Sequence, residues 1–286
     1  MNTLDSFLEQ AWNDHADQPA GVAERLSQGL RFVQDDDGVM RLAALAHHVL
    51  GEHLGRWQEG LSFLLLLKQR AGGAIGAASI ARCQASLALS AGLTDGRPAM
   101  TQSDRCRVSS MAASNLATSD AARSSTLLRD AVAHAGDLTD DDAGVRALAA
   151  NGNNIAATLM DRAPLDEEPR SLMIRAAEVA RTHWERAGSW LEVERAEYRL
   201  AMCWLAAGDP GGAQRHARRC ESVVRQNGSI PLELFFAAEA LCMSARALGD
   251  RQASAGALET ARQAFHVLTP DDQAWCRRTL DKLDAT

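Results

Sequence analysis

The sequence predicts an all-α protein of about fourteen helices. Apolar residues recur at spacings of three and four along most of the chain, as in residues 192–208, where they form one stripe of a helix. Aromatic residues make up only 5% of the chain, and runs of alternating β-branched residues, which favour strands, are missing. Clusters of helix-stopping residues separate the periodic segments, and they set the order of the expected helices.

The expected helix boundaries follow these clusters along the chain. Most of them combine glycine or proline with small polar residues, which end one helix and cap the next. Asp120, Asp209 and Asp250 stand where the N-cap of a helix is expected. The clusters lie at 71–73, 92–98, 136–142, 163–169, 208–212, 227–231 and 268–272. None of them is long or low in complexity, so we expect a single domain over residues 1–286.

Composition and charge exclude several classes of function. The formal net charge of −7 argues against nucleic-acid binding, which needs a basic surface. The N-terminus lacks the charged and apolar regions of a signal peptide, and the most apolar run, residues 61–67, is far shorter than the roughly 20 residues that span a bilayer. Six cysteines stand singly, as expected for buried, reduced thiols. We therefore expect a cytoplasmic protein without membrane insertion.

Three segments of the chain, 42–67, 197–220 and 237–261, share one pattern. Each holds an apolar-periodic helix, a turn of small residues (LGR, AGD or LGD) and a second helix. A small residue lies five positions after the turn glycine, and the residue twelve positions earlier is expected to face it where the two helices cross. These facing pairs are His48 with Gly60, Ala201 with Ala213, and Cys242 with Ser254.

This pattern resembles tetratricopeptide (TPR) repeats, whose paired helices carry small residues at these positions and an LGD-like turn. Residues 107–135, with Ala112 and Ser124 at the crossing, fit a fourth pair, and 145–160 with 170–188 fit a fifth. The repeats are longer than the family's, as in bacterial regulatory proteins, and the first 65 residues are similar to segments that precede cyclase output domains. The resemblance implies an α-solenoid, a superhelix of antiparallel pairs.

The helix expected near 74–91 has no obvious partner in this scheme. Residues 61–68 raise a related question, because they are apolar on every side and predict a helix that is covered all round. Burial inside the superhelix is the first interpretation. A homodimer through the Leu61–Leu67 helix is the second.

The concave groove that the resemblance implies is the expected binding surface. With Gly152 at a crossing, Arg146 and Asn153 project into the groove and Asn154 lies close by. Asparagine and arginine there offer several donors in fixed directions for a peptide backbone or a terminal carboxylate. The segment ANGNN at 150–154 is a poor helix former, which points to function or, alternatively, to a frayed or capped turn. The matching positions in the next two pairs are Arg195, Tyr198, Met202, Phe236, Glu239 and Met243.

The segment HHVLGEH raises the question of a metal site. On an α-helix His48 and Glu52 share a face, whereas His47 and His53 point elsewhere. Zinc needs three or four convergent ligands, which one such pair does not supply. We therefore predict no metal ligand here and interpret His48 as a crossing or groove residue, with His47 and His53 in solvent.

Other motifs also favour structural interpretations. His216 and Cys220 form a second pair spaced by four, but the arginines around them indicate a solvated outer face. The glycine-rich run 70–79 lacks the preceding strand and the signature lysine of a phosphate loop. Paired acidic residues lie in turns and first helical turns, where the helix dipole favours them. The sequence predicts no catalytic residue and no cofactor.

The sequence leaves three alternative functions open. The first is a non-enzymatic bacterial scaffold or adaptor that binds a peptide or protein partner in the groove of the solenoid. The second is a regulator that senses a small ligand and passes a change in superhelical curvature to a partner. The third is a helical enzyme, which would require a deep pocket of convergent titratable groups.

Overall fold

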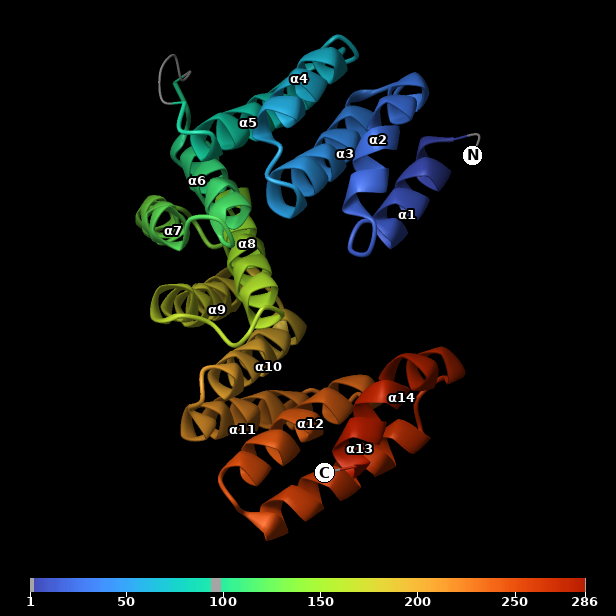
Figure 1. Cartoon of the computed structure of the whole chain (residues 1–286), viewed down its shortest axis with the longest axis vertical. Coiled ribbons are helices and arrows are strands. Elements are labelled where there is room, and N and C mark those ends of the chain that lie inside the picture. The colour runs from blue at the N-terminus through green and yellow to red at the C-terminus, as the bar shows by residue number, and fades with distance from the viewer. Residues whose placement is uncertain (1–2, 94–98, 286) are drawn as a thin grey trace. The chain divides into compact units, whose positions relative to one another are not determined.

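The structure is a computed structural model that describes residues 3–93 and 99–285. This part of the chain forms fourteen α-helices, one 3-10 helix and one π-helix, and it contains no strand (Figure 1). The prediction of an all-α fold is therefore confirmed. The break expected at 92–98 falls mostly on residues 94–98, which lie outside the described residues. None of the helices described is both long and apolar enough to cross a membrane.

Contacts divide the chain into two compact units, Met1–Leu138 and Thr139–Thr286. The first unit contains α1 (Leu4–Asp14), α2 (Pro19–Gly29), the 3-10 helix Leu30–Phe32, α3 (Asp36–His47), the π-helix His48–His53, α4 (Trp57–Lys68), α5 (Ala74–Ser90), α6 (Gln102–Leu116) and α7 (Ala121–Ala135). The second contains α8 (Ala143–Met160), α9 (Glu167–Ala187), α10 (Trp190–Ala206), α11 (Pro210–Gln226), α12 (Pro231–Ala247), α13 (Arg251–His266) and α14 (Pro270–Asp284). Helices of a repeat array contact mainly their neighbours, so the expectation of a single domain stays a prediction.

The helices begin at the predicted caps. The carboxylates of Asp120, Asp209 and Asp250 each accept a hydrogen bond from the backbone N–H three residues later, at 3.0, 2.8 and 2.9 Å. Such a bond satisfies one of the free donors at a helix N-terminus and contributes about 1 kcal/mol. The three predicted N-caps are therefore confirmed, and the helix bounds place a break at each turn cluster that the structure describes.

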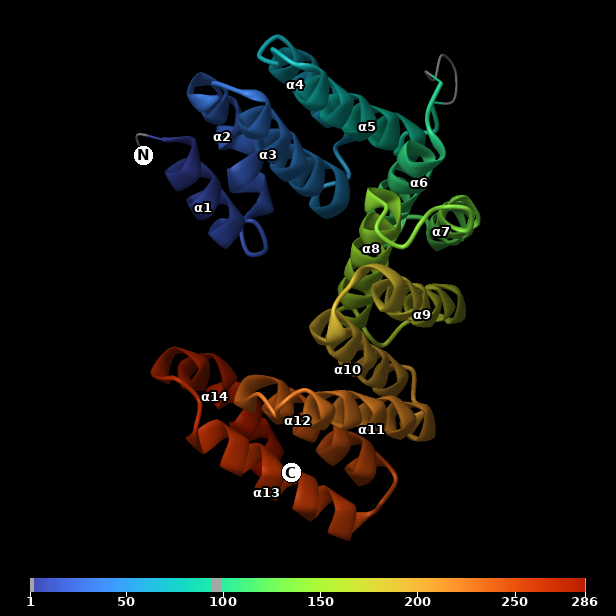
Figure 2. The same cartoon turned by 180° about the vertical axis from the view of Figure 1, so that it is seen from behind.

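Consecutive helices pack as pairs within each unit, as both views show for α12 with α13 and for α8 with α9 (Figures 1 and 2). Two of the predicted crossings are seen in contacts. The sulfur of Cys242 lies 3.5 Å from the hydroxyl of Ser254. At Gly152, a Cβ atom would stand only 2.8 Å from the backbone oxygen of Ala176 on α9. The small residues therefore lie where two helix backbones come close.

The helix at 74–91 is not without partners. As α5 it packs against α3, α4 and α6. Its Leu87 meets Gly60 of α4, where an added Cβ would lie 2.7 Å from a Leu87 methyl group and 3.5 Å from Leu50. The predicted crossing of Gly60 with His48 is therefore wrong, because the side chain of a third helix occupies the space.

The prediction that α4 is covered all round is also wrong. Leu64 and Leu67 are fully buried in the core of the first unit, whereas Leu65 and Leu66 are 59% and 51% exposed. Helices α3 and α5 pack against α4 but do not cover Leu65 and Leu66, so a helix that is apolar on every side leaves one face in solvent. Leu65 and Leu66 are called the exposed leucine pair below. The homodimer through this helix stays a prediction.

The segment HHVLGEH does not form the regular α-helix that the sequence suggests. It ends α3 as a π-helix, in which the N–H of Leu54 donates to the carbonyl of Val49, five residues earlier, at 3.1 Å. The extra residue in the turn changes which side chains share a face. His53 therefore reaches His48, against the expectation that it points away. The expectation that His47 is solvated is wrong as well, because it is buried beside the Ser86 hydroxyl, and burial lowers its pKa to about 4.

Candidate functional site

A pocket of about 430 Å³ lies in the second unit, between helices α8, α10, α12 and α14. We call it the carboxylate pocket. Four of the predicted groove residues line it: Asn153, Arg195, Tyr198 and Phe236. The other lining residues are Met160, Glu194, Arg199, Leu232, Glu233 and Trp275. The volume falls in the range of about 300–1,000 Å³ that is usual for ligand sites in proteins.

The start of α10 fixes the side chains that face the pocket. Ser189 and Glu192 form a capping box, in which the hydroxyl of Ser189 accepts from the backbone of Leu191 and the Glu192 carboxylate accepts from the backbone N–H of Ser189. The hydroxyl of Ser189 also donates to the Glu192 carboxylate, at 2.6 Å, and this bond together with the one from the Ser189 backbone N–H lowers the pKa of Glu192 to about 2. With the register set there, Glu194 and Tyr198, four residues apart, reach the same pocket.

The floor of the pocket holds two buried carboxyl groups. Glu194 is fully buried and Glu233 is 5% exposed. Burial raises the pKa of Glu194 to about 8; the hydrogen bond from the Cys220 thiol, at 2.8 Å, opposes this rise, and the nearby Glu233 adds to it. Glu233 is paired instead with Arg195, whose Nη2 lies 2.6 Å from its Oε1. Burial therefore favours the carboxylic acid form of Glu194 at neutral pH, beside the ion pair of Glu233 with Arg195.

One wall of the pocket is aromatic. The ring of Phe236 lies 5.6 Å from that of Tyr198 and 5.2 Å from that of Trp275, measured between centroids. The hydroxyl of Tyr198 donates to the buried carboxylate of Glu239 at 2.9 Å, which holds the tyrosine ring in place. Trp275 is 65% exposed, so much of its apolar surface is free to cover a ligand.

Two polar atoms of the lining are buried without a hydrogen-bond partner among the described residues. They are Oε2 of Glu194 and Nε of Arg199. Leaving such groups unpaired costs about 1–3 kcal/mol each, and more when the group is charged. The protonated carboxyl and the guanidinium both offer N–H or O–H donors, so a ligand with an acceptor oxygen is the natural partner.

We compared the chain with protein-family models, with curated proteins and with solved structures. None of the three comparisons finds a match. The likeness to tetratricopeptide repeats therefore depends on the helix pairs and their crossing residues alone. What the structure shows is an all-α, repeat-like fold in which consecutive helices pack as pairs.

The other predicted groove residues lie elsewhere. Arg146 is exposed and donates to the backbone oxygen of Ala187 and to Glu192, both at 3.2 Å, and its guanidinium also lies over the ring of Trp184. Glu239 is buried behind Tyr198. Asn154, Met202 and Met243 are half-buried and do not line the pocket. The asparagines of ANGNN belong to regular helix α8, so the alternative of a frayed turn is wrong.

Sequence reasoning missed Glu194, Glu233 and Trp275. The two glutamates are buried on α10 and α12, but neither falls on a predicted apolar stripe, and a charged residue is expected in solvent unless it is paired. Trp275 belongs to α14, outside the repeated pattern, so no spacing rule placed it near the pocket.

His216 and Cys220 do not meet at a common point. His216 Nδ1 lies 2.6 Å from a Glu197 carboxylate oxygen, and Cys220 donates to Glu194 instead. The two residues therefore face α10, and the prediction of a solvated outer face is wrong for them. It holds for the neighbouring arginines of α11, which are all exposed: Arg215, Arg218, Arg219 and Arg225.

Proposed function

We propose that this chain is a non-enzymatic interaction protein of the tetratricopeptide-like kind, which binds a peptide or protein partner through the carboxylate pocket. The observation that carries the proposal is the unpartnered Nε of Arg199 beside an aromatic wall. A peptide segment with an apolar side chain and a carboxylate or carbonyl oxygen matches both the aromatic wall and the unpartnered guanidinium. The apolar side chain packs on Phe236 and Trp275, and the oxygen accepts from Arg199.

The charge of the pocket favours an acidic group on the partner. Two arginines line the pocket, one of them paired with Glu233, and burial favours the uncharged form of Glu194. The amide of Asn153 adds further donors and acceptors at the α8 side. A C-terminal carboxylate preceded by an apolar residue fits this set best. The proposal places the protein in the cytoplasm of a bacterium, without nucleic acid as a partner.

A display library of random peptides with free C-termini tests this proposal. We expect enrichment of peptides with an apolar last residue, and at least tenfold weaker binding by the Trp275→Ala variant. Amidation of the C-terminus should weaken binding to a similar extent, because it removes the negative charge that Arg199 attracts. Val267→Ala is the matched control, since Val267 is also an exposed apolar side chain of the second unit but does not line the pocket.

A second candidate function is the sensing of a small ligand, and the size of the pocket favours it. In this case a small carboxylate occupies the pocket and changes the packing of α10 against α12, which a partner protein then detects. A thermal-shift screen of small organic acids separates the two candidates. Stabilisation by one such acid, with no peptide enriched, would favour the sensor; no binding of either kind would exclude both functions for this pocket.

A further inference from the structure

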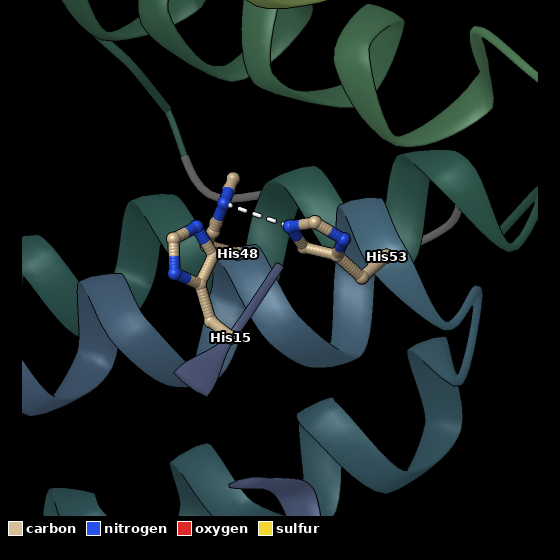
Figure 3. Close-up of side chains that lie close together, drawn as sticks. All are labelled: His15, His48 and His53. Atoms are coloured by element: carbon tan, nitrogen blue, oxygen red, sulfur yellow. Dashed lines mark hydrogen bonds between the residues drawn. The ribbon is translucent and has the colours of Figure 1, made fainter. Parts of the chain in front are cut away.

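Three histidines of the first unit come together on one side of the π-helix. His48 and His53 begin and end this helix, and His15 is the C-cap of α1. One ring nitrogen of each lies within 4.8 Å of those of the other two. Figure 3 shows the rings of His48 and His53 turned toward each other, with His15 beside His48. The Nε2 atoms of His48 and His53 are 3.1 Å apart.

The π-helix is the reason why these residues meet. In an α-helix a residue five positions on is turned by about 140°, toward the opposite side. The π-helical hydrogen bond from Leu54 to Val49 adds one residue to the turn, which brings His53 round to the side of His48. Such insertions are rare and are frequently found at functional sites.

The chemistry of the rings limits how they contact one another without an ion. A hydrogen bond between two Nε2 atoms needs one N–H and one lone pair, so His48 and His53 cannot both present the same form. His15 donates its Nδ1–H to the backbone oxygen of Trp12, which leaves the lone pair on its Nε2. The Nε2 lone pairs of His15 and His48 therefore lie close together, with a single N–H, that of His53, between the two Nε2 atoms of His48 and His53.

Two of the histidines are already oriented as metal ligands usually are. A ligating histidine almost always gives its other ring N–H to a carbonyl or a carboxylate. For His15 that acceptor is the Trp12 carbonyl, and for His48 it is Glu52, whose carboxylate oxygen lies 3.3 Å from Nδ1. Glu52 is itself held by the hydroxyl of Ser114 at 3.0 Å.

We propose that His15, His48 and His53 bind a divalent transition metal of the zinc class, with one ligand nitrogen from each ring. With Zn–N bonds of about 2.0–2.1 Å, tetrahedral geometry places the nitrogens about 3.3 Å apart. The separation of 3.1 Å between His48 and His53 fits this value, and a nitrogen of His15 lies within 4.8 Å of both, so a small approach of His15 would complete the set of three ligands. Three imidazoles suit zinc, nickel, cobalt or copper, whereas calcium and magnesium prefer oxygen ligands.

The metal would tie the end of α1 to the π-helix, two segments that are more than thirty residues apart in the sequence. His53 is exposed, so the fourth coordination position faces solvent and is open to water or to a ligand group of a partner. The alternative is that the rings only pack with Trp12, whose ring centroid lies 5.4 Å from that of His48. This alternative predicts no affinity for metal.

The test uses the full chain without a polyhistidine tag, with zinc chloride or cobalt chloride as the only added metal. We expect one Zn²⁺ per chain by equilibrium dialysis, and a visible absorption band of bound Co²⁺ that reports four-coordinate geometry. The His48→Ala and His53→Ala variants should each bind Zn²⁺ more than about 100-fold more weakly, because loss of an orienting group alone costs 10- to 100-fold. Glu52→Gln, which removes the negative charge beside His48 but keeps an oxygen that can accept from its Nδ1–H, should weaken binding about tenfold.

His266→Ala is the matched control, since His266 is an exposed histidine on α13 that belongs to the other unit. Circular dichroism checks that each variant folds. Because His53 is exposed, its replacement by alanine removes a ligand without opening a cavity, so this variant decides the matter if His48→Ala fails to fold. Absence of stoichiometric Zn²⁺ from the wild-type chain, or equal affinity in His53→Ala and His266→Ala, would overturn the proposal.

Discussion

Glu194 makes the stability of the second unit depend on pH in a direction unusual for a glutamate. Burial raises its pKa from 4.5 to about 8. The unfolded chain releases this proton near pH 4.5, whereas the folded chain keeps it up to about pH 8. Between these values the unfolded state binds fewer protons, so the free energy of unfolding falls as the pH rises. The stability from this group is complete below pH 4.5 and is lost as the pH passes through 8.

The size of the effect follows from the shift. A difference of about 3.5 pKa units at 1.36 kcal/mol per unit gives about 5 kcal/mol, which is an upper limit because Glu233 contributes to the same shift. The Glu194→Gln variant imitates the protonated acid. Its amide oxygen can still accept from the Cys220 thiol. This variant should therefore keep its stability at high pH.

The assay is urea unfolding at a series of pH values from 4 to 9, followed by circular dichroism and tryptophan fluorescence. We expect the wild-type chain to lose up to about 5 kcal/mol relative to Glu194→Gln over this range. Glu192→Gln is the control on the same helix. Because the pKa of Glu192 is lowered to about 2, its contribution is present above pH 4.5 and lost below, which is the opposite sign. A difference between wild type and Glu194→Gln that does not change with pH would refute the reasoning.

Three more predictions concern packing and charge. Gly152→Ala should lower the free energy of unfolding by about 1–2 kcal/mol, because the new Cβ would meet the Ala176 backbone, whereas Gly256→Ala, with nothing within 4 Å, should raise it by about 0.5–1 kcal/mol. His47 stays neutral down to about pH 4, so the free energy of unfolding of the wild-type chain should fall by up to about 3 kcal/mol between pH 6.5 and pH 4. Urea titrations of His47→Gln should lack this fall, because the variant has no imidazole to protonate. Replacement of the exposed leucine pair of α4 by glutamine should abolish any dimer seen by sedimentation; a dimer that persists would exclude this helix as its interface.

Most of the fold could be predicted because helix periods and turn residues act locally. Asp120, Asp209 and Asp250 cap helices as expected, and Gly152 lies at a crossing because only a missing side chain allows two backbones so close. The exposure of Leu65 was missed, since periodicity tells which face of a helix is apolar but not how many neighbours the fold supplies.

The pocket could be predicted only in part, because the sequence pattern places residues on a helix but does not give the contacts between distant helices. Tyr198 and Phe236 follow from their positions on the first helices of two pairs. Trp275 approaches Phe236 only through the packing of α14 against α12, a contact between helices that no repeat spacing describes. Long-range pairing of this kind depends on how the helices stack, and one sequence does not encode it in a local pattern.

The π-helix explains both the failed interpretation of HHVLGEH and the site found there. The apolar residues Ala46, Leu50 and Leu54 recur at the spacing of four that is typical of an α-helix, so the pattern gives no sign of the inserted residue. Judged as an α-helix, the segment offers one histidine beside Glu52, and three ligands are needed. The insertion supplies His53, and α1 supplies His15. The π-helical turn replaces regular α-helical hydrogen bonds and brings three imidazoles together. We therefore expect the irregular turn to be maintained for binding rather than for stability.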